Sequence, residues 1–222
     1  MIIINPSILS ADFNNMESEI KRIEKSDTNM IHIDIMDGVF VPNITFGMSF
    51  VKSLRKITNL TFDVHLMIKD PIRYIDEFSE AGADIISFHY EACDNPKEVI
   101  ERIHKNGKKA ALAIKPNTKV EAVYQFLDSL DMVLIMTVYP GFSGQKFISE
   151  MLDKIETLKN YINANGFKTD IEVDGGINSE TVVECVKKGA NVAVSGSTLF
   201  NADDFAAKLK EMKTAAENNY RG

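Results

Sequence analysis

Short apolar runs and amphipathic segments alternate along the whole chain. The apolar runs are rich in β-branched residues and have the length of strands. Several, such as MVLIMTV, are apolar throughout, which is typical of parallel strands that are covered on both faces. The predicted strands cover residues 2–9, 30–36, 61–67, 84–90, 109–114, 131–138, 170–175 and 191–196.

The segments between these runs repeat apolar residues at helical spacing. Gly82, Gly107, Gly166 and Gly189 follow four of them, at the position where a helix end favours glycine. The predicted helices cover residues 16–26, 73–82, 96–107, 148–166, 179–189 and 203–217.

Eight strand–helix repeats of about 25 residues predict an α/β fold, a (β/α)8 TIM barrel that forms a single domain over residues 1–222. The alternative is a doubly wound open sheet, which usually has fewer strands and a glycine-rich turn after the first one. Here the first predicted strand runs into SILSADF, which contains no glycine, and no stretch has the composition of a linker.

Composition excludes several classes of protein. The 222 residues are 45% hydrophobic and 26% charged, which is ordinary for a soluble domain. The net charge of −7, with basic residues scattered along helices, argues against a nucleic-acid partner. The two cysteines lack zinc-finger spacing, and no run approaches the ~18 apolar residues of a membrane span. We therefore expect a cytoplasmic protein with no membrane partner.

The run HIDIMDG places a histidine and a carboxylate inside an apolar strand. Buried charges are costly unless they are paired or bound to a metal. His32, Asp34 and Met36 alternate along the strand, so their side chains share one face. His65 and Met67 repeat this arrangement on the third predicted strand, and the seventh ends at Asp174.

The carboxyl ends of barrel strands meet at one rim, where active sites form. Two histidines and two carboxylates converging there, His32, Asp34, His65 and Asp174, predict a site for a divalent transition metal. The alternative reading is a set of hydrogen-bonded core residues, which is the usual role of one histidine on an apolar strand.

Neighbouring polar residues are expected outside the ligand set. Asp37 and Asp63 fit a role around the ligands or at strand ends, whereas His89 and His104 fit the core and a helix surface. The methionines that follow the polar cluster are either core residues or the lining of a pocket: Met36, Met67 and Met136.

Two glycine-rich stretches, DGGIN (174–178) and SGSTLF (195–200), follow the seventh and eighth predicted strands. Barrels often bind phosphate there through backbone N–H groups. A third stretch, YPGFSGQKF (139–147), follows the sixth strand and is long enough to close over the mouth as a lid.

The segments SILSADF, HIDIMDGVFVPNITFG, DVHLMI, PGFSGQKF, DGGIN and GSTLF, in order from residue 5 to about residue 200, resemble the ribulose-phosphate 3-epimerase family. The resemblance implies a ribulose-phosphate-binding (β/α)8 barrel of the pentose phosphate pathway. Such an enzyme interconverts ribulose 5-phosphate and xylulose 5-phosphate, which would be small-molecule ketose phosphate partners of this chain.

The resemblance also implies roles for individual residues. His32, Asp34, His65 and Asp174 would hold one divalent cation, zinc or else manganese, iron or cobalt, and Asp34 and Asp174 would be the acid/base pair. The methionines 36, 67 and 136 would line the pocket. The implied substrate contacts are Ser7, His65, Gly141, Phe142, Ser143, Gly144, Asp174, Gly175, Gly176, Gly196 and Ser197.

Three rim residues depart from the usual pattern of the family: Tyr139 and Ser143 in the lid stretch and Lys115 after the fifth strand. Relatives that act on allulose 6-phosphate also vary in the lid, so the sequence leaves two substrates possible, a five-carbon and a six-carbon ketose phosphate. A lysine-centred decarboxylase or aldolase, with Lys115 as its one candidate, and a non-catalytic sugar-phosphate binder are further alternatives. We also expect a homo-oligomer.

Overall fold

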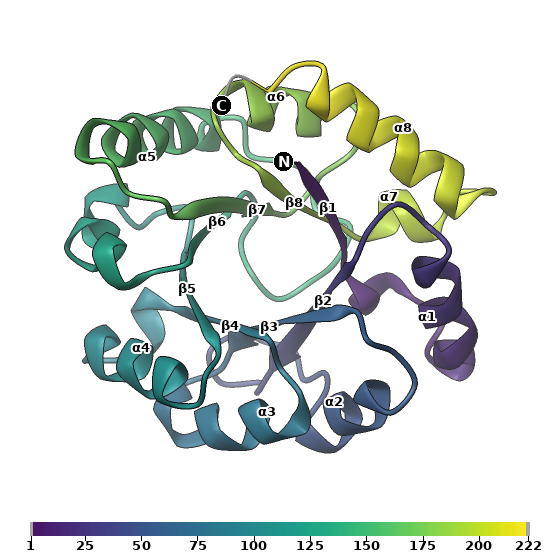
Figure 1. Cartoon of the computed structure of the whole chain (residues 1–222), viewed down its shortest axis with the longest axis horizontal. Coiled ribbons are helices and arrows are strands. Elements are labelled where there is room, and N and C mark those ends of the chain that lie inside the picture. The colour runs from purple at the N-terminus through teal and green to yellow at the C-terminus, as the bar shows by residue number, and fades with distance from the viewer. Residues whose placement is uncertain (1, 221–222) are drawn as a thin grey trace.

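A computed structural model describes residues 2–220. Eight parallel strands form one sheet in the order β1-β8-β7-β6-β5-β4-β3-β2, and the helices surround it as an outer ring (Figure 1). A parallel bridge between Ser7 and His32 joins the two ends of the sheet, which makes a nearly closed barrel. The predicted (β/α)8 fold is confirmed.

The strands lie where the apolar runs predict them. β2, β3 and β5 keep the predicted bounds, and the other five begin or end one to three residues inside them. The strands are β1 (Ile3–Pro6), β2 (Met30–Met36), β3 (Thr61–Met67), β4 (Ile85–His89), β5 (Lys109–Ile114), β6 (Met132–Met136), β7 (Asp170–Asp174) and β8 (Val192–Ser195).

All six predicted helices are present, with shorter bounds. The helix α2, the four-residue helix α7 and the ten-residue 3-10 segment η5 lie outside the six helices named from the sequence. The α-helices are α1 (Met16–Glu24), α2 (Met48–Arg55), α3 (Ile75–Ala81), α4 (Pro96–Lys105), α5 (Met151–Asn165), α6 (Thr181–Lys187), α7 (Ser197–Phe200) and α8 (Phe205–Glu217). The 3-10 segments are η1 (Ile8–Ser10), η2 (Phe13–Asn15), η3 (Pro71–Tyr74), η4 (Tyr90–Ala92) and η5 (Val120–Ser129).

The core lies between the strands and the helices that cover them. Ile31, Ile33 and Ile35 of β2 pack outward into it, while His32 and Asp34 alternate with them and face the barrel interior. The expected single domain over residues 1–222 stays a prediction, and the one continuous sheet supports it.

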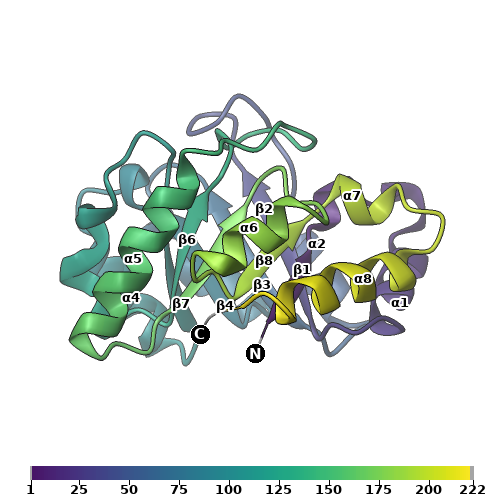
Figure 2. The ribbon, with the colours of Figure 1, turned by 90° about the horizontal axis from the view of Figure 1, so that it is seen from above.

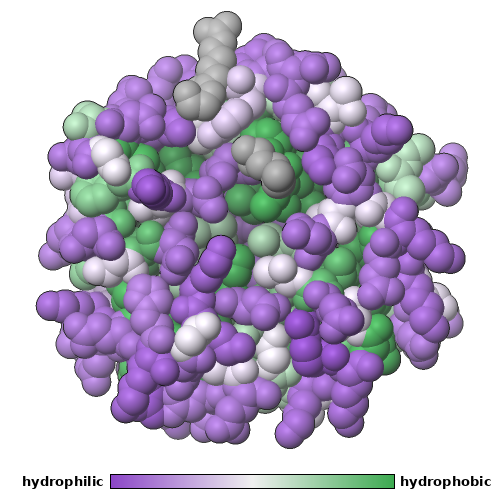
Figure 3. All heavy atoms as spheres, in the orientation of Figure 1, coloured by the Kyte–Doolittle hydropathy of each residue, from purple (hydrophilic) through white to green (hydrophobic). Residues whose placement is uncertain are grey.

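The two faces of the barrel differ. The strands run toward one face, where the connecting loops rise highest, and the described chain begins and ends at the opposite face (Figure 2). That opposite face is covered mostly by hydrophilic side chains (Figure 3). None of the helices between residues 2 and 220 has the length and apolar character that a transmembrane span needs.

Candidate active site

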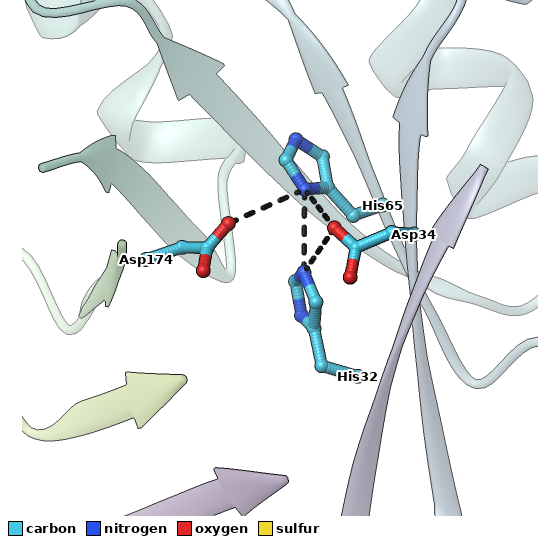
Figure 4. A group of neighbouring side chains, drawn as sticks. All are labelled: His32, Asp34, His65 and Asp174. Carbon is cyan, nitrogen blue, oxygen red and sulfur yellow. Dashed lines mark hydrogen bonds and ion pairs between the residues drawn. The ribbon is translucent and has the colours of Figure 1, made fainter. Parts of the chain in front are cut away.

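Four polar side chains from three strands meet inside the barrel at the carboxyl ends of the strands. His32 and Asp34 come from β2, His65 from β3 and Asp174 from β7 (Figure 4). Their facing donor atoms, one from each residue, all lie within 4.8 Å of one another. The structure therefore brings together the four residues that the sequence singles out as metal ligands.

The donor atoms are crowded in a way that suits a cation. Nε2 of His32 lies 3.2 Å from Nδ1 of His65, and Oδ1 of Asp34 lies 3.4 Å and 3.5 Å from these two nitrogens. Asp174 Oδ2 lies 4.0 Å from His65 Nδ1. Two imidazole nitrogens and two carboxylate oxygens form a donor set that a divalent transition metal accepts, so the residues fit such an ion.

The nitrogen of His32 that points away from the cluster, Nδ1, contacts a further carboxylate. Nδ1 of His32 lies 2.6 Å from Oδ2 of Asp63, and Asn5 Nδ2 donates to the same oxygen at 2.9 Å. Asn5 Nδ2 also donates to Oε1 of Glu172 at 3.0 Å. Asp63 thus lies next to a candidate ligand, as expected, and Asn5 and Glu172 extend a buried polar layer across the barrel interior.

The outward nitrogen of His65 is bound by a third histidine. Nε2 of His65 lies 2.9 Å from Nε2 of His89, whose Nδ1 lies 3.3 Å from Oε2 of Glu91. His89 has no exposed surface. Burial, opposed by the nearby Glu91, lowers the pKa of His89 to about 4, so its imidazole is neutral.

The two aspartates of the cluster differ in how readily they take up a proton. Burial opposes ionisation of Asp34, but His32 and His65 outweigh it and hold its pKa well below the usual range. Burial, helped by the charge of Asp34, raises the pKa of Asp174 to about 6. Ser7 Oγ donates to Asp34 Oδ2 at 2.6 Å, which also favours the ionised form. The pair combines a fixed carboxylate with a group that exchanges a proton near neutral pH.

A cavity of about 460 Å³ opens above the cluster. Asp34 and Asp174 lie in its wall, together with the three methionines expected there, Met36, Met67 and Met136. His65 is the one predicted substrate contact that does not line it, and its side chain is fully buried. The other predicted contacts in its wall are Ser7, Gly141, Phe142, Ser143, Gly144, Gly175, Gly176, Gly196 and Ser197.

The loop 139–147 forms one side of the cavity, as expected of a lid. Asn43 Nδ2 donates to the Gly141 carbonyl at 2.9 Å, and the hydroxyls of Ser143 and Ser10 lie 2.7 Å apart. Gln145 Nε2 donates to two carbonyls of the same loop, which folds it into a compact turn.

Two glycines let the backbone approach this cavity closely. Gly176 has a φ of +66°, and a Cβ there would lie 2.5 Å from the backbone nitrogen of Phe147. A Cβ at Gly196 would lie 2.6 Å from Ser10 Oγ. Glycine is a steric requirement at Gly176, where the positive φ and the backbone contact coincide, whereas at Gly196 the close atom is the end of the Ser10 side chain, which can rotate away.

Sequence reasoning missed part of the polar network. No sequence motif marked Asn5, Glu172 or Glu91 as members of the network. His89 was assigned to the core, and its contact with His65 was not predicted. Asp37 lies at a strand end, as expected, where it accepts hydrogen bonds from three backbone N–H groups. His104 lies on α4 beside Asp131, away from the cluster.

Comparison with known proteins decides the family. Residues 3–200 match the model of the Ribulose-phosphate 3 epimerase family. The chain belongs to this family. It is 47% identical to ribulose-phosphate 3-epimerase of Bacillus subtilis, over 96% of this chain and 99% of that one. It is 45% identical to ribulose-phosphate 3-epimerase of Methanocaldococcus jannaschii, over 97% and 92% of the two chains. The chain is therefore an isomerase of the epimerase type.

Solved structures with low identity share the fold of this epimerase. KGPDC from Streptococcus mutans matches with a TM-score of 0.70 at 12% identity, covering 99% of this chain and all of that one. The 3-hexulose-6-phosphate synthase from Salmonella typhimurium matches with a TM-score of 0.67 at 18% identity, also covering 99% of this chain and all of that one. These likenesses support the barrel and nothing finer.

Proposed function

We propose that this epimerase inverts C3 of D-ribulose 5-phosphate to give D-xylulose 5-phosphate, and the reverse, with one divalent metal ion. The observation that carries the proposal is the pairing of Asp34 and Asp174. They come from β2 and β7, their facing oxygens lie within 4.8 Å, and both line the cavity. The names of the curated relatives supply the substrate. We expect the enzyme to act in the cytoplasm, in the pentose phosphate pathway.

Inversion at a carbon next to a ketone needs a base on one face and an acid on the other. One aspartate removes the C3 proton, and the other returns a proton to the opposite face. The roles exchange in the reverse reaction. Asp34, held ionised by two histidines and Ser7, suits the acceptor, and Asp174, which protonates more readily, suits the donor.

His32, Asp34, His65 and Asp174 would hold the metal. When bound, a divalent cation supplies Lewis-acid stabilisation of the negative charge that develops as the C3 proton leaves. Zinc is our first choice for two imidazoles and two carboxylates, and manganese, iron and cobalt fit the same donors.

The remaining cavity residues bind and shield the substrate. The thioethers of Met36, Met67 and Met136 give a lining that excludes water without a strong metal ligand. The backbone of the lid and of the segments at Gly176 and Gly196 would hold the phosphate end, where N–H groups can come close to an anion.

Isotope exchange tests the proton transfer. Turnover in heavy water should place solvent deuterium at C3 of product and of recovered substrate, observed by proton NMR. Turnover without deuterium at C3 would contradict the two-carboxylate mechanism. Metal analysis of the purified protein should find close to one divalent ion per chain.

The second candidate substrate is D-allulose 6-phosphate, which would give D-fructose 6-phosphate. Tyr139 and Ser143 favour it, because both belong to the lid that would sense substrate length, and Tyr139 is exposed at the rim. Values of kcat/KM for the two ketose phosphates, measured side by side, decide between them. We expect the five-carbon substrate to be preferred, and a strong preference for allulose 6-phosphate would contradict this choice.

Lys115, the one lysine candidate that the sequence offers, is poorly placed for lysine-centred chemistry. Its ammonium lies 3.7 Å from the centroid of the Phe40 ring, and Lys115 does not belong to the cavity wall, which includes Lys146 of the loop 139–147 instead. We expect borohydride in the presence of substrate to trap no covalent adduct, and an adduct at either lysine would favour a lysine-centred reaction.

We further propose that the enzyme is a homo-oligomer. Exposed apolar surface often marks a contact between proteins, and here it gathers on loops at the carboxyl ends of the strands. The exposed large hydrophobic side chains on these loops are Phe13, Val39, Ile44, Tyr139 and Phe142. Sedimentation should give at least twice the chain mass of 24.8 kDa, whereas a monomer would contradict the proposal.

A further inference from the structure

A chain of hydrogen-bonding groups leads from the candidate ligand His65 to the rim of the barrel. His65 Nε2 lies 2.9 Å from His89 Nε2, and His89 Nδ1 lies 3.3 Å from Glu91 Oε2. Both imidazoles are fully buried, and Glu91 lies on η4, directly after β4. The chain ends at the loop 115–119, where the other oxygen of Glu91 accepts hydrogen bonds from the Lys115 N–H at 2.9 Å and from the Thr118 hydroxyl.

The partners fix the position of each proton. The Glu91 carboxylate faces N–H and O–H groups and can only accept, so Nδ1 of His89 carries a proton. With its proton at Nδ1, the neutral form of the His89 ring offers a lone pair at Nε2. His65 then donates from its own Nε2, so in the neutral His65 ring it is Nδ1 that keeps the lone pair a metal ligand needs. That Nδ1 is the atom that faces His32, Asp34 and Asp174.

The loop that holds Glu91 is itself fixed from outside the barrel. The ammonium of Lys154, on α5, donates to the carbonyls of Lys115, Pro116 and Thr118 at 3.1, 2.9 and 2.7 Å. One cation thus binds three carbonyls of the turn whose N–H and hydroxyl bind Glu91. Glu91 is therefore held by His89 on one side and, on the other, by a loop that Lys154 fixes in turn.

We propose that His89 and Glu91 are positioning residues that hold His65 in the one neutral tautomer able to bind the metal through Nδ1. This inference rests on the proposed metal-dependent function. It gives both histidine ligands a carboxylate partner, since Asp63 binds His32 directly and Glu91 acts on His65 through His89. Groups that orient a ligating histidine typically change metal affinity 10–100-fold when they are removed.

Glu91→Gln tests the carboxylate at constant shape. Glutamine has one acceptor oxygen, where Glu91 uses two. If the amide nitrogen faces His89 Nδ1, His89 has to accept there and the proton positions on His89 and His65 reverse. If the amide oxygen faces His89 instead, the hydrogen bonds to Lys115 and Thr118 are lost. We expect zinc affinity, measured by chelator competition on the metal-free protein, to fall about 10–100-fold. Glu121→Gln removes the same charge from an exposed site beside this loop and should leave the affinity unchanged.

His89→Gln and His89→Leu separate positioning from packing. Glutamine keeps an acceptor for the Nε2–H of His65, so zinc affinity should stay within a few-fold of the wild-type value. Leucine removes the acceptor and should weaken zinc binding about 10–100-fold. Equal losses in both variants, with parallel losses of thermal stability, would show a merely structural role and overturn the proposal.

The tautomer can be observed directly. Long-range proton–nitrogen NMR spectra of the full-length wild-type protein should show His65 protonated at Nε2 with and without zinc, and partly at Nδ1 in Glu91→Gln. A wild-type His65 protonated at Nδ1 without metal would overturn the inference. Wild-type protein that binds no zinc, manganese or cobalt would instead contradict the proposed function, and the spectrum of the metal-free protein would still decide the tautomer.

Discussion

Nδ1 of His32 lies 2.6 Å from Oδ2 of Asp63, and neither side chain has any exposed surface. The carboxylate accepts from the ring N–H at Nδ1, so Nε2 is the nitrogen that faces Asp34 and His65 and is available to a metal ion. Asn5 donates to the same carboxylate oxygen, which keeps Asp63 in place. This contact orients a candidate metal ligand from within the barrel interior.

Asp63→Asn should weaken zinc binding by about tenfold or more, because a neutral amide is a poorer partner for the His32 N–H than a carboxylate. Chelator competition measures the change. Asp128→Asn, which alters an exposed aspartate at the end of η5, is the control and should bind zinc as the wild type does. Unchanged affinity in Asp63→Asn would remove Asp63 from its orienting role.

Asp34→Asn and Asp174→Asn should each lower kcat by at least about 10³-fold, because each removes one of the two groups that move the C3 proton. The measurement is turnover of ribulose 5-phosphate at saturating metal, with metal content and circular dichroism confirming loaded, folded protein. If one variant keeps near-normal turnover, that aspartate is not an acid/base group.

Ser10→Ala and Ser143→Ala should each lower kcat/KM by about 3–10-fold, because each breaks the 2.7 Å contact between the lid and η1. The kcat/KM of the double variant should be no lower than that of either single variant, because both remove the same contact. The departure from additivity then corresponds to a coupling energy of about 1 kcal/mol. Ser129→Ala, at an exposed site on η5, is the control. Additive effects would mean that the two hydroxyls act independently.

Gly176→Ala should lower the free energy of unfolding by about 2–4 kcal/mol and raise KM, because it combines a positive φ with a clash against the Phe147 backbone. Two other glycines separate these causes. Gly107 has a φ of +70°, and a Cβ added there would meet no atom within 4 Å, so Gly107→Ala should cost about 1 kcal/mol.

Gly47 has neither a positive φ nor a nearby atom, and Gly47→Ala should change stability by about 0.5 kcal/mol or less. Urea unfolding measures all three variants. Equal losses at positions 107 and 176 would show that the contact with Phe147 contributes nothing.

The barrel and the convergence of His32, Asp34, His65 and Asp174 could be predicted because both follow from local sequence patterns. β2 and β3 are apolar runs interrupted only at alternate positions, so the interruptions mark the inward face as well as the strand. The helix α2 was not among the helices named from the sequence, and neither its length nor its uncapped start explains this, because α3 and α6 are shorter and also lack a side-chain capping bond. The ten residues of η5 form a 3-10 segment, which lacks the 3.6-residue period by which a helix is recognised in a sequence.

The network around the ligands could not be predicted, because it depends on barrel closure. Asn5 and Glu172 are 167 residues apart and meet only because β1, β8 and β7 are neighbours in the sheet. His89 looks like an ordinary core histidine until β4 is placed beside β3. Pairings of this kind depend on the register between neighbouring strands of the barrel. This register cannot be read from any single stretch of the chain.

The lid bonds outward only to Asn43 and Ser10 among the side chains of residues 2–220, and neither of these touches the four ligand residues. The hydrogen bonds that hold the predicted lid are thus separate from those that hold His32, Asp34, His65 and Asp174. A substitution at Asn43, Ser10 or Ser143 would alter the wall of the cavity and leave the polar cluster intact, so substrate preference and the chemistry of the cluster can vary independently.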